Sequence, residues 1–221
     1  MAANRTARQI RADDTRARLF AAATELFATR GYHEASVDAI VKRAGVAKGT
    51  FFVHFATKDA VIVDLVRMQT RAAKRARTAA VPQGPVAALR AAVLALGEQA
   101  GLSRELSRAV LEATLENADV SGDADQMFGE ILADMTADAR AAIEAGVLHA
   151  SRDPVLIARA LMASYLGAAL HFCSSRKSGP LLEILAPLVD ANIQGFMNPE
   201  ASHDPSPRTR TPGRRRRRLL D

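Results

Sequence analysis

The sequence has little cysteine, the residue whose disulfides stabilise small secreted proteins, and few aromatic residues. Its 221 residues include one cysteine, Cys173, no tryptophan, two tyrosines and eight phenylalanines. A single cysteine excludes an internal disulfide and is expected of a protein in the reducing cytoplasm. The N-terminus carries charges with no apolar segment behind them, so we expect no signal peptide.

A long apolar run is also missing. The nearest approach to a membrane span is residues 160–175, sixteen residues without a charge. This stretch is shorter than the roughly 20 residues that a bilayer requires, and it contains Ser164 and His171. We therefore expect a buried interface helix and no membrane partner.

The composition favours an all-α protein. Alanine, leucine, arginine and glutamate are frequent and favour helix, and no long alternating β-branched run is present. Helices are predicted at residues 13–29, 36–44, 47–52, 57–79, 86–100, 103–118, 126–146, 153–176 and 180–196. The main breaks are predicted at residues 82–85, 101–103, 119–125 and 146–154, where Gly, Pro, Ser and Asp gather.

The net charge of +6 is unevenly distributed. Residues 1–80 carry +8, residues 81–200 carry −7 and residues 201–221 carry +5. A basic N-terminal segment is typical of a module that binds nucleic-acid phosphates. The acidic middle is a poor match for DNA, so it must have another role.

Residues 36–58, SVDAIVKRAGVAKGTFFVHFATK, form the most informative segment. Ser36 is a good helix N-cap, and the apolar residues behind it recur at helical spacing. Gly45 allows the left-handed backbone that a tight turn requires, and Val46 fills the gap between two helices. Two short helices joined in this way indicate a helix-turn-helix, whose second helix lies in a DNA major groove.

The segment closely resembles the DNA-binding signature of TetR-type transcriptional repressors. The matching residues are Ile40, Ala44, Gly45, Val46, Lys48, Gly49, Thr50, Phe52, His54, Phe55 and Lys58. The resemblance is strong at residues 15–65, moderate at 139–196 and weak between them. It implies an N-terminal three-helix helix-turn-helix DNA-binding unit followed by a larger helical ligand-binding and dimerisation domain. Phe52 stands where the family usually has tyrosine, so a hydroxyl that often touches phosphate is missing.

We divide the chain into four parts. A basic flexible arm is expected at 1–12, the helix-turn-helix domain at 13–58, the ligand-binding and dimerisation domain at 59–198, and a disordered Arg-rich tail at 199–221. The arm and the tail either add DNA contacts or serve only as solubilising termini. We expect the basic end of the predicted helix 57–79 to be a solvated face of the protein.

The family resemblance predicts the DNA contacts. These residues are Ser36, Ala47, Lys48, Gly49, Thr50, Phe51, His54 and Lys58. Lys48 can donate to guanine, and Thr50 and Phe51 can touch a thymine methyl. Ser36, His54 and Lys58 are carried over as phosphate contacts. Ser36 can also act only as a cap and His54 only as a structural residue, whereas Phe52 and Phe55 are assigned to the core.

A specific site requires two such units, so we expect a homodimer and a near-palindromic operator. The last two helices are too apolar to remain exposed, and small residues on the first allow close approach. A four-helix bundle between two copies is the expected arrangement. Its predicted contacts are Ala160, Ser164, Gly167, Ala168, Leu181, Leu185, Leu188 and Phe196.

By resemblance, the middle helices enclose a pocket for a small molecule. The predicted lining is Leu65, Met68, Leu111, Leu115, Phe128, Leu132, Tyr165 and Phe172. This set is mainly aliphatic, which predicts an apolar effector, although such residues are often plain core. His149 and His171 are isolated, so we predict no metal site and no cofactor.

These features together predict a ligand-responsive repressor that binds double-stranded DNA as a dimer and is released by the small molecule. No nucleophile elbow, P-loop, Rossmann glycine pattern or zinc spacing is present, so we do not expect an enzyme. A non-specific architectural DNA-binding protein and a transcriptional activator of the same fold are the alternatives.

Overall fold

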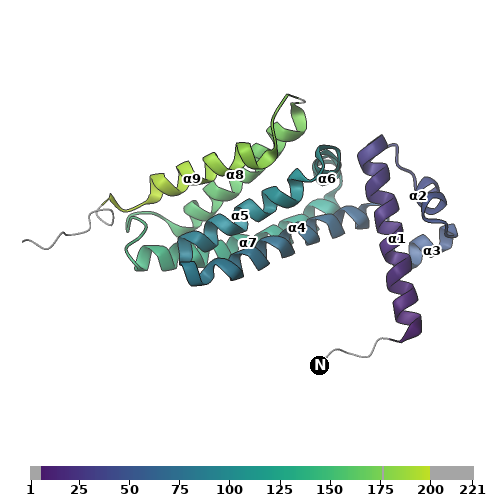
Figure 1. Cartoon of the computed structure of the whole chain (residues 1–221), viewed down its shortest axis with the longest axis horizontal. Coiled ribbons are helices and arrows are strands. Elements are labelled where there is room, and N and C mark those ends of the chain that lie inside the picture. The colour runs from purple at the N-terminus through teal and green to yellow at the C-terminus, as the bar shows by residue number, and fades with distance from the viewer. Residues whose placement is uncertain (1–5, 176, 200–221) are drawn as a thin grey trace, which may run out of the picture.

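The computed structural model describes residues 6–175 and 177–199, and this part of the chain contains helices and no strand (Figure 1). The result confirms the all-α prediction. The nine α-helices are α1 (Ala7–Arg30), α2 (Val37–Ala44), α3 (Lys48–His54), α4 (Asp59–Ala80), α5 (Pro85–Gly101), α6 (Arg104–Glu116), α7 (Ala118–Glu144), α8 (Pro154–Ser174) and α9 (Leu181–Phe196), with a 3-10 turn at Val81–Gln83.

Helices α1 to α3 form a separate unit at one end of the molecule, as Figure 1 shows. Helix α1 runs across the ends of the longer helices, and α2 and α3 lie on its outer side. Helix α4 leads from this unit into the larger domain, where α4, α5, α7, α8 and α9 run lengthwise. The short helix α6 packs against α1, α7 and α8, so it lies where the two parts meet.

Two hydrophobic cores support this arrangement. The larger core joins α4, α5, α7, α8 and α9 around residues such as Leu96, Met135 and Leu161. The smaller core joins α1 to α4 around Phe27 and Phe51, and it continues into Ala109, Ala113 and Val120 of α6 and α7. The N-terminal unit is therefore completed by side chains from the larger domain.

The first helix begins earlier than predicted. We expected it at Asp13, at the end of a mobile arm, but it begins at Ala7. Thr6 and Gln9 form a capping box: the Gln9 amide donates to Thr6 Oγ1, and the Thr6 amide donates to Gln9 Oε1. Residues 7–12 are thus helical, whereas residues 1–5 of the predicted arm lie outside the described residues.

The predicted break at residues 119–125 is also wrong, because α7 begins at Ala118. Only Asn117 separates α6 from α7, and its side chain accepts hydrogen bonds from the amides of Asp119 and Val120. Val120 and Ala124 are buried. The burial of this apolar face outweighs the polar, Gly-containing sequence that predicted a loop. Of the predicted tail at residues 199–221, residues 200–221 lie outside the described residues.

Candidate nucleic-acid interface

The turn between α2 and α3 has the expected geometry. Gly45 has φ +65°, in the left-handed region, and Ser36 caps α2 by accepting a hydrogen bond from the Ala39 amide at 3.2 Å. Arg18 of α1 donates to the carbonyl of Ala44 and, at 3.4 Å, to that of Gly45. Arg18 therefore fixes the turn to α1, and nothing in the local sequence pattern distinguished this arginine from a solvated one.

The two phenylalanines of α3 and Phe55, which ends the helix, divide between core and surface differently from our prediction. Phe51 is fully buried and its ring centroid lies 5.6 Å from that of Phe55, which is also buried. Phe52 is 51% exposed and Val53 is 79% exposed. Phe51 therefore cannot reach a thymine methyl without unfolding the core, and the prediction that it contacts DNA is wrong. Phe52, which we assigned to the core, lies on the surface.

The N-terminal end of α3 is open to solvent. Ala47, Lys48 and Gly49 are exposed, and Thr50 is half-buried. The Lys48 ammonium pairs with Asp38 of α2 at 2.8 Å, and both side chains are more than half exposed. An exposed pair of this kind is weak and screened by salt, so Lys48 is free to exchange Asp38 for another acceptor.

The three predicted phosphate contacts have different surroundings. Ser36 is exposed and caps α2, and His54 is half-buried near the end of α3. The Lys58 ammonium donates to the Tyr32 carbonyl at 2.8 Å and lies 4.2 Å from the Tyr32 ring centroid. Burial lowers the pKa of Lys58. Lys58 is therefore already engaged within the protein.

A hydrogen-bonded cluster joins this unit to the larger domain. The Tyr32 hydroxyl donates to Asp59 at the start of α4, and Asn117 Nδ2 donates to Asp59 Oδ2 at 2.7 Å. Burial raises the pKa of Asp59, and the hydrogen bond from Asn117 opposes that rise. Asp59 thus connects the end of the helix-turn-helix unit to the corner between α6 and α7, a connection that no sequence motif indicated.

The basic end of α4 is only partly the solvated face that we favoured. Arg71 and Arg75 are exposed, but Arg77 makes two hydrogen bonds of 2.6 and 2.8 Å to Asp138 of α7. Asp138 is 8% exposed, and its hydrogen bond raises the pKa of Arg77. Lys74 of α4 forms an ion pair with Glu130, which also lies on α7. Half of this basic run therefore holds α4 against α7.

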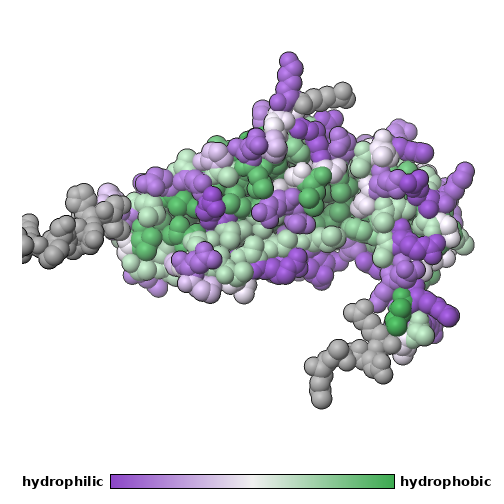
Figure 2. Space-filling view, in the orientation of Figure 1, coloured by the Kyte–Doolittle hydropathy of each residue, from purple (hydrophilic) through white to green (hydrophobic). Residues whose placement is uncertain are grey.

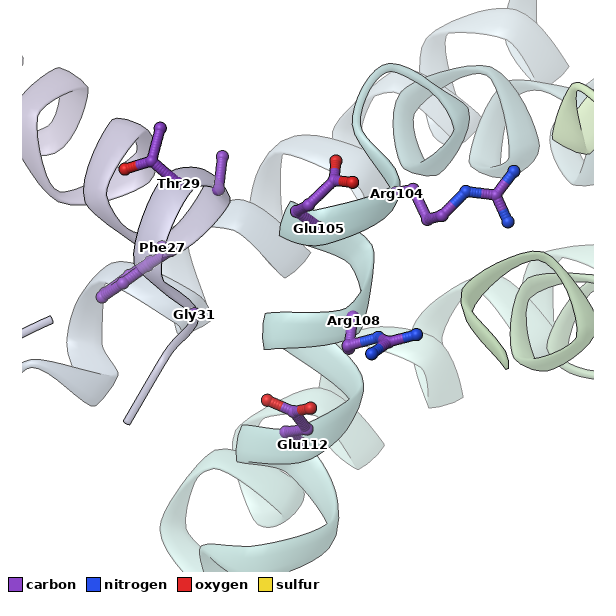
Figure 3. Close-up of a pocket in the computed structure, with 8 residues that line it drawn as sticks. Phe27, Thr29, Gly31, Arg104, Glu105, Arg108 and Glu112 are labelled. Atoms are coloured by element: carbon purple, nitrogen blue, oxygen red, sulfur yellow. The ribbon is translucent and has the colours of Figure 1, made fainter. Parts of the chain in front are cut away.

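A groove of about 600 Å³ separates the end of α1 from the start of α6, as Figure 3 shows. Arg104 and Arg108 point away from α1 in that view. Their guanidinium groups donate to backbone carbonyls at the end of α8, among them Phe172 and Cys173. These charges are complementary to the negative end of the α8 dipole. The two arginines therefore join α6 to α8 and are not free to bind an anion in the groove.

Two smaller cavities lie between the helices that we expected to enclose a ligand. One of about 190 Å³ is lined by Leu65 and Met68 of the predicted set. The other, of about 70 Å³, is lined by Leu111, Phe128 and Tyr165. Gln69 lines both cavities, and sequence reasoning had omitted it because a glutamine in a basic, amphipathic helix is normally solvated.

Three predicted lining residues are placed elsewhere. Leu115 is 81% exposed, so its assignment to the pocket is wrong. Leu132 packs against the large core, and Phe172 is buried beneath the Arg104 guanidinium, 4.1 Å from the ring centroid. Neither lines the two cavities. Among the described residues, no group of three or more His, Cys, Asp or Glu side chains is placed to hold a metal ion.

The predicted dimer contacts also divide into two groups. Ala168, Leu181 and Leu185 are buried within their own chain, so they are not available to a partner. They fill the space between α5, α8 and α9. Helical periodicity alone does not show whether an apolar residue faces its own core or a subunit interface. Ala160, Ser164 and Phe196 are half-buried, and Gly167 and Leu188 are exposed.

The exposed residues of α8 and α9 still leave an apolar face. Leu156, Leu166 and Leu170 of α8 are between 48% and 58% exposed, and Leu188 of α9 is 44% exposed. In Figure 2 the visible face of the larger domain carries a broad band of hydrophobic residues, whereas hydrophilic residues dominate the N-terminal unit. By length and composition alone α8 is apolar enough to cross a membrane, but a single helix of this kind is weak evidence for a membrane span, and 44% of its most apolar stretch is buried inside the protein.

The comparisons with known proteins agree with this geometry. Residues 19–65 match the family model described as bacterial regulatory proteins, tetR family. The HTH-type transcriptional activator FasR of Mycolicibacterium smegmatis is 44% identical over 55 residues, which are 25% of this chain and 25% of that protein. The match thus covers about a quarter of the length of that relative and lies in a family of transcriptional regulators.

Solved structures match over most of the chain. The fatty acid degradation regulator FadR from Bacillus halodurans has a TM-score of 0.72 at 20% identity, over 82% of this chain and 95% of that one. FadR from Bacillus subtilis, solved in complex with stearoyl-CoA, has a TM-score of 0.71 at 17% identity, over 81% and 98%. At this identity the likeness shows that the fold is shared.

Proposed function

We propose, from the match of residues 19–65 to the tetR family model, that the chain is a sequence-specific, ligand-responsive transcriptional regulator of the TetR family, located in the cytoplasm. The observation that carries the proposal is the exposed N-terminal end of α3, held by a capped α2, a left-handed Gly45 and Arg18. This is the geometry in which the second helix of the motif enters a major groove. We propose no enzymatic activity.

The residues that meet DNA follow from their exposure. Ala47, Lys48, Gly49 and Thr50 lie at the start of α3, where the helix dipole favours the DNA backbone. Phe51 is replaced in this role by the exposed Phe52, whose ring and lack of a hydroxyl suit it to an apolar contact. Ser36, His54 and Lys58 are the proposed phosphate contacts, and Lys58 must leave Tyr32 to make one.

We propose that two copies associate through α8 and α9. The exposed leucines of these helices supply the apolar surface, and Gly167 on the same side allows a second helix to approach closely. Asn192 donates to Ser164 at 2.9 Å and keeps the two helices in register within one chain. A twofold dimer presents two α3 helices and therefore reads a near-palindromic operator.

We propose that the two cavities beside Gln69 receive the effector. The larger cavity is lined by residues of α1, α4 and α6, so a molecule within it touches the DNA-binding domain directly. A ligand that binds better to one orientation of α1 shifts the protein towards that orientation. We favour repression that the effector relieves, with activation as the alternative because the named relative FasR is an activator.

Selection of bound duplexes from a random pool, at near-physiological salt, tests the proposal. We expect a near-palindromic sequence to be enriched, because specific binding exceeds non-specific binding by roughly 10³ or more at such salt. DNA retained without an enriched sequence would contradict the proposal. It would indicate a non-specific architectural protein, whose binding depends on the basic segments and falls steeply with salt.

A further inference from the structure

Gln69 separates the two cavities described above. The chamber of about 190 Å³ lies on one side, with Phe20 and Thr24 of α1 and Leu106 of α6 in its wall. The chamber of about 70 Å³ lies on the other side, among α6, α7 and α8. The residues that line both are Gln69, Ala100, Ser107 and Val110. The two chambers are therefore adjacent halves of one elongated space.

No charged side chain is among the residues that line either chamber. The surface grooves nearby differ in this respect, because Arg104, Glu105, Arg108 and Glu112 line one of them. A charged group is costly to remove from water unless a partner of opposite charge receives it. A molecule that fills the two chambers is therefore uncharged.

Among the described residues that line the chambers, three polar side chains make no hydrogen bond within the protein, namely Gln69, Gln99 and Tyr165. Gln69 is 8% exposed and Tyr165 is 5% exposed. No fully buried side-chain nitrogen or oxygen in the described part of the chain lacks a hydrogen-bond partner, so the Gln69 amide and the Tyr165 hydroxyl, which make no hydrogen bond within the protein, are reached by solvent. Ser107 differs, because it donates to the Ala100 carbonyl. Burial raises the pKa of Tyr165, so the hydroxyl stays protonated and remains a donor.

A polar side chain that lines a cavity and makes no hydrogen bond within the protein can pair with water or with a ligand. Gln69 lines both chambers, so a molecule that occupies them can replace the water at the amide with a hydrogen-bonding group of its own.

We propose that one uncharged, elongated and mainly apolar molecule with a single hydrogen-bonding group, such as an alcohol or an amide, occupies both chambers and pairs with the Gln69 amide. The inference rests on the proposed function and specifies its effector. The combined space is below the roughly 300 Å³ of most ligand pockets, so the effector is small. Its end in the larger chamber presses on Phe20 and Thr24, which moves α1 and the helix-turn-helix unit with it.

Calorimetric titration of the full-length protein with 1-octanol, octanoate and octylammonium at pH 7 tests the inference. The three probes have the same chain and differ in the charge of the head group. We expect 1-octanol to bind and the two ions to bind at least tenfold more weakly. Gln69→Leu should weaken 1-octanol binding roughly tenfold, and Tyr165→Phe, which removes only a hydroxyl, should weaken it less. Gln126→Leu, on the exposed surface of α7, is the matched control.

Thermal unfolding gives a second readout that a purely structural amide would not share. Gln69→Leu replaces an amide that makes no hydrogen bond within the protein, so it should leave the melting temperature unchanged or raise it while it weakens binding. A lower melting temperature would show that the amide is satisfied in the fold and would overturn the proposal. Equal 1-octanol affinity in the wild type and Gln69→Leu, tighter binding of either ion, or no 1-octanol binding would overturn it as well.

The duplex selection separates this inference from the proposed function. Intact operator binding without 1-octanol binding would overturn the effector class alone. Binding of 1-octanol by a protein that selects no sequence would overturn the proposed function and leave the site in place.

Discussion

Gly49→Ala tests how closely α3 approaches DNA. A Cβ built at Gly49 meets no atom of the protein within 4 Å, and the residue is not among the glycines with positive φ. Alanine is therefore tolerated without strain, and it favours helix over glycine by up to about 1 kcal/mol. In a protein of this size that gain raises the melting temperature by roughly 2–4 °C per kcal/mol.

The same methyl should weaken operator binding. Gly49 is exposed at the end of α3 that we propose faces the groove, where an added Cβ would separate the helix from the DNA. A disturbed contact of this kind costs about 1–3 kcal/mol, which corresponds to roughly fivefold to 150-fold in affinity. Fluorescence anisotropy with the selected operator measures the change, and circular dichroism measures the melting temperature of the same sample.

Gly129→Ala is the matched control, because Gly129 is an exposed helical glycine of α7 whose Cβ also meets no atom within 4 Å. It should gain similar stability and bind the operator as the wild type does. If Gly49→Ala also binds the operator with unchanged affinity, α3 does not approach DNA through this residue, and our reasoning about the interface is wrong.

Three other substitutions test the packing and the assembly. Arg77→Met leaves Asp138 buried without its partner and should lower the free energy of unfolding in urea by about 3 kcal/mol. Adding Asp138→Leu should recover most of this stability. An unchanged free energy of unfolding in the single variant would show that the ion pair is solvated. Gly97→Ala places a Cβ on the Leu185 Cδ2 methyl and should destabilise the protein by about 1–3 kcal/mol in thermal unfolding, although alanine favours helix more than glycine does. A stabilised variant would refute the close approach of α5 and α9. Leu170→Glu should reduce the proposed dimer to a monomer in light scattering and weaken operator binding, and an intact dimer would place the interface elsewhere.

Local sequence determined much of the fold. The helix-turn-helix depends on a cap at Ser36, a left-handed residue at Gly45 and apolar spacing within each helix, and all of these act over a few residues. The helices from α5 to α9 likewise follow their periodicity and breakers. The exceptions are also instructive, because both the early start of α1 and the early start of α7 rely on side-chain caps within polar segments.

Only the tertiary structure decided which side of each helix faces which neighbour. Adjacent residues on a helix are about 100° apart, so the pair Phe51 and Phe52 requires one side chain inside and one outside. The sequence cannot choose between them, because the choice depends on where α1 and α4 lie. Ala168 and Leu185 were ambiguous for the same reason, since an apolar residue suits the core and an interface equally. The position of Gln69 beside the two chambers became recognisable only in the folded protein, because the neighbouring helices that line the chambers with it are distant in the sequence.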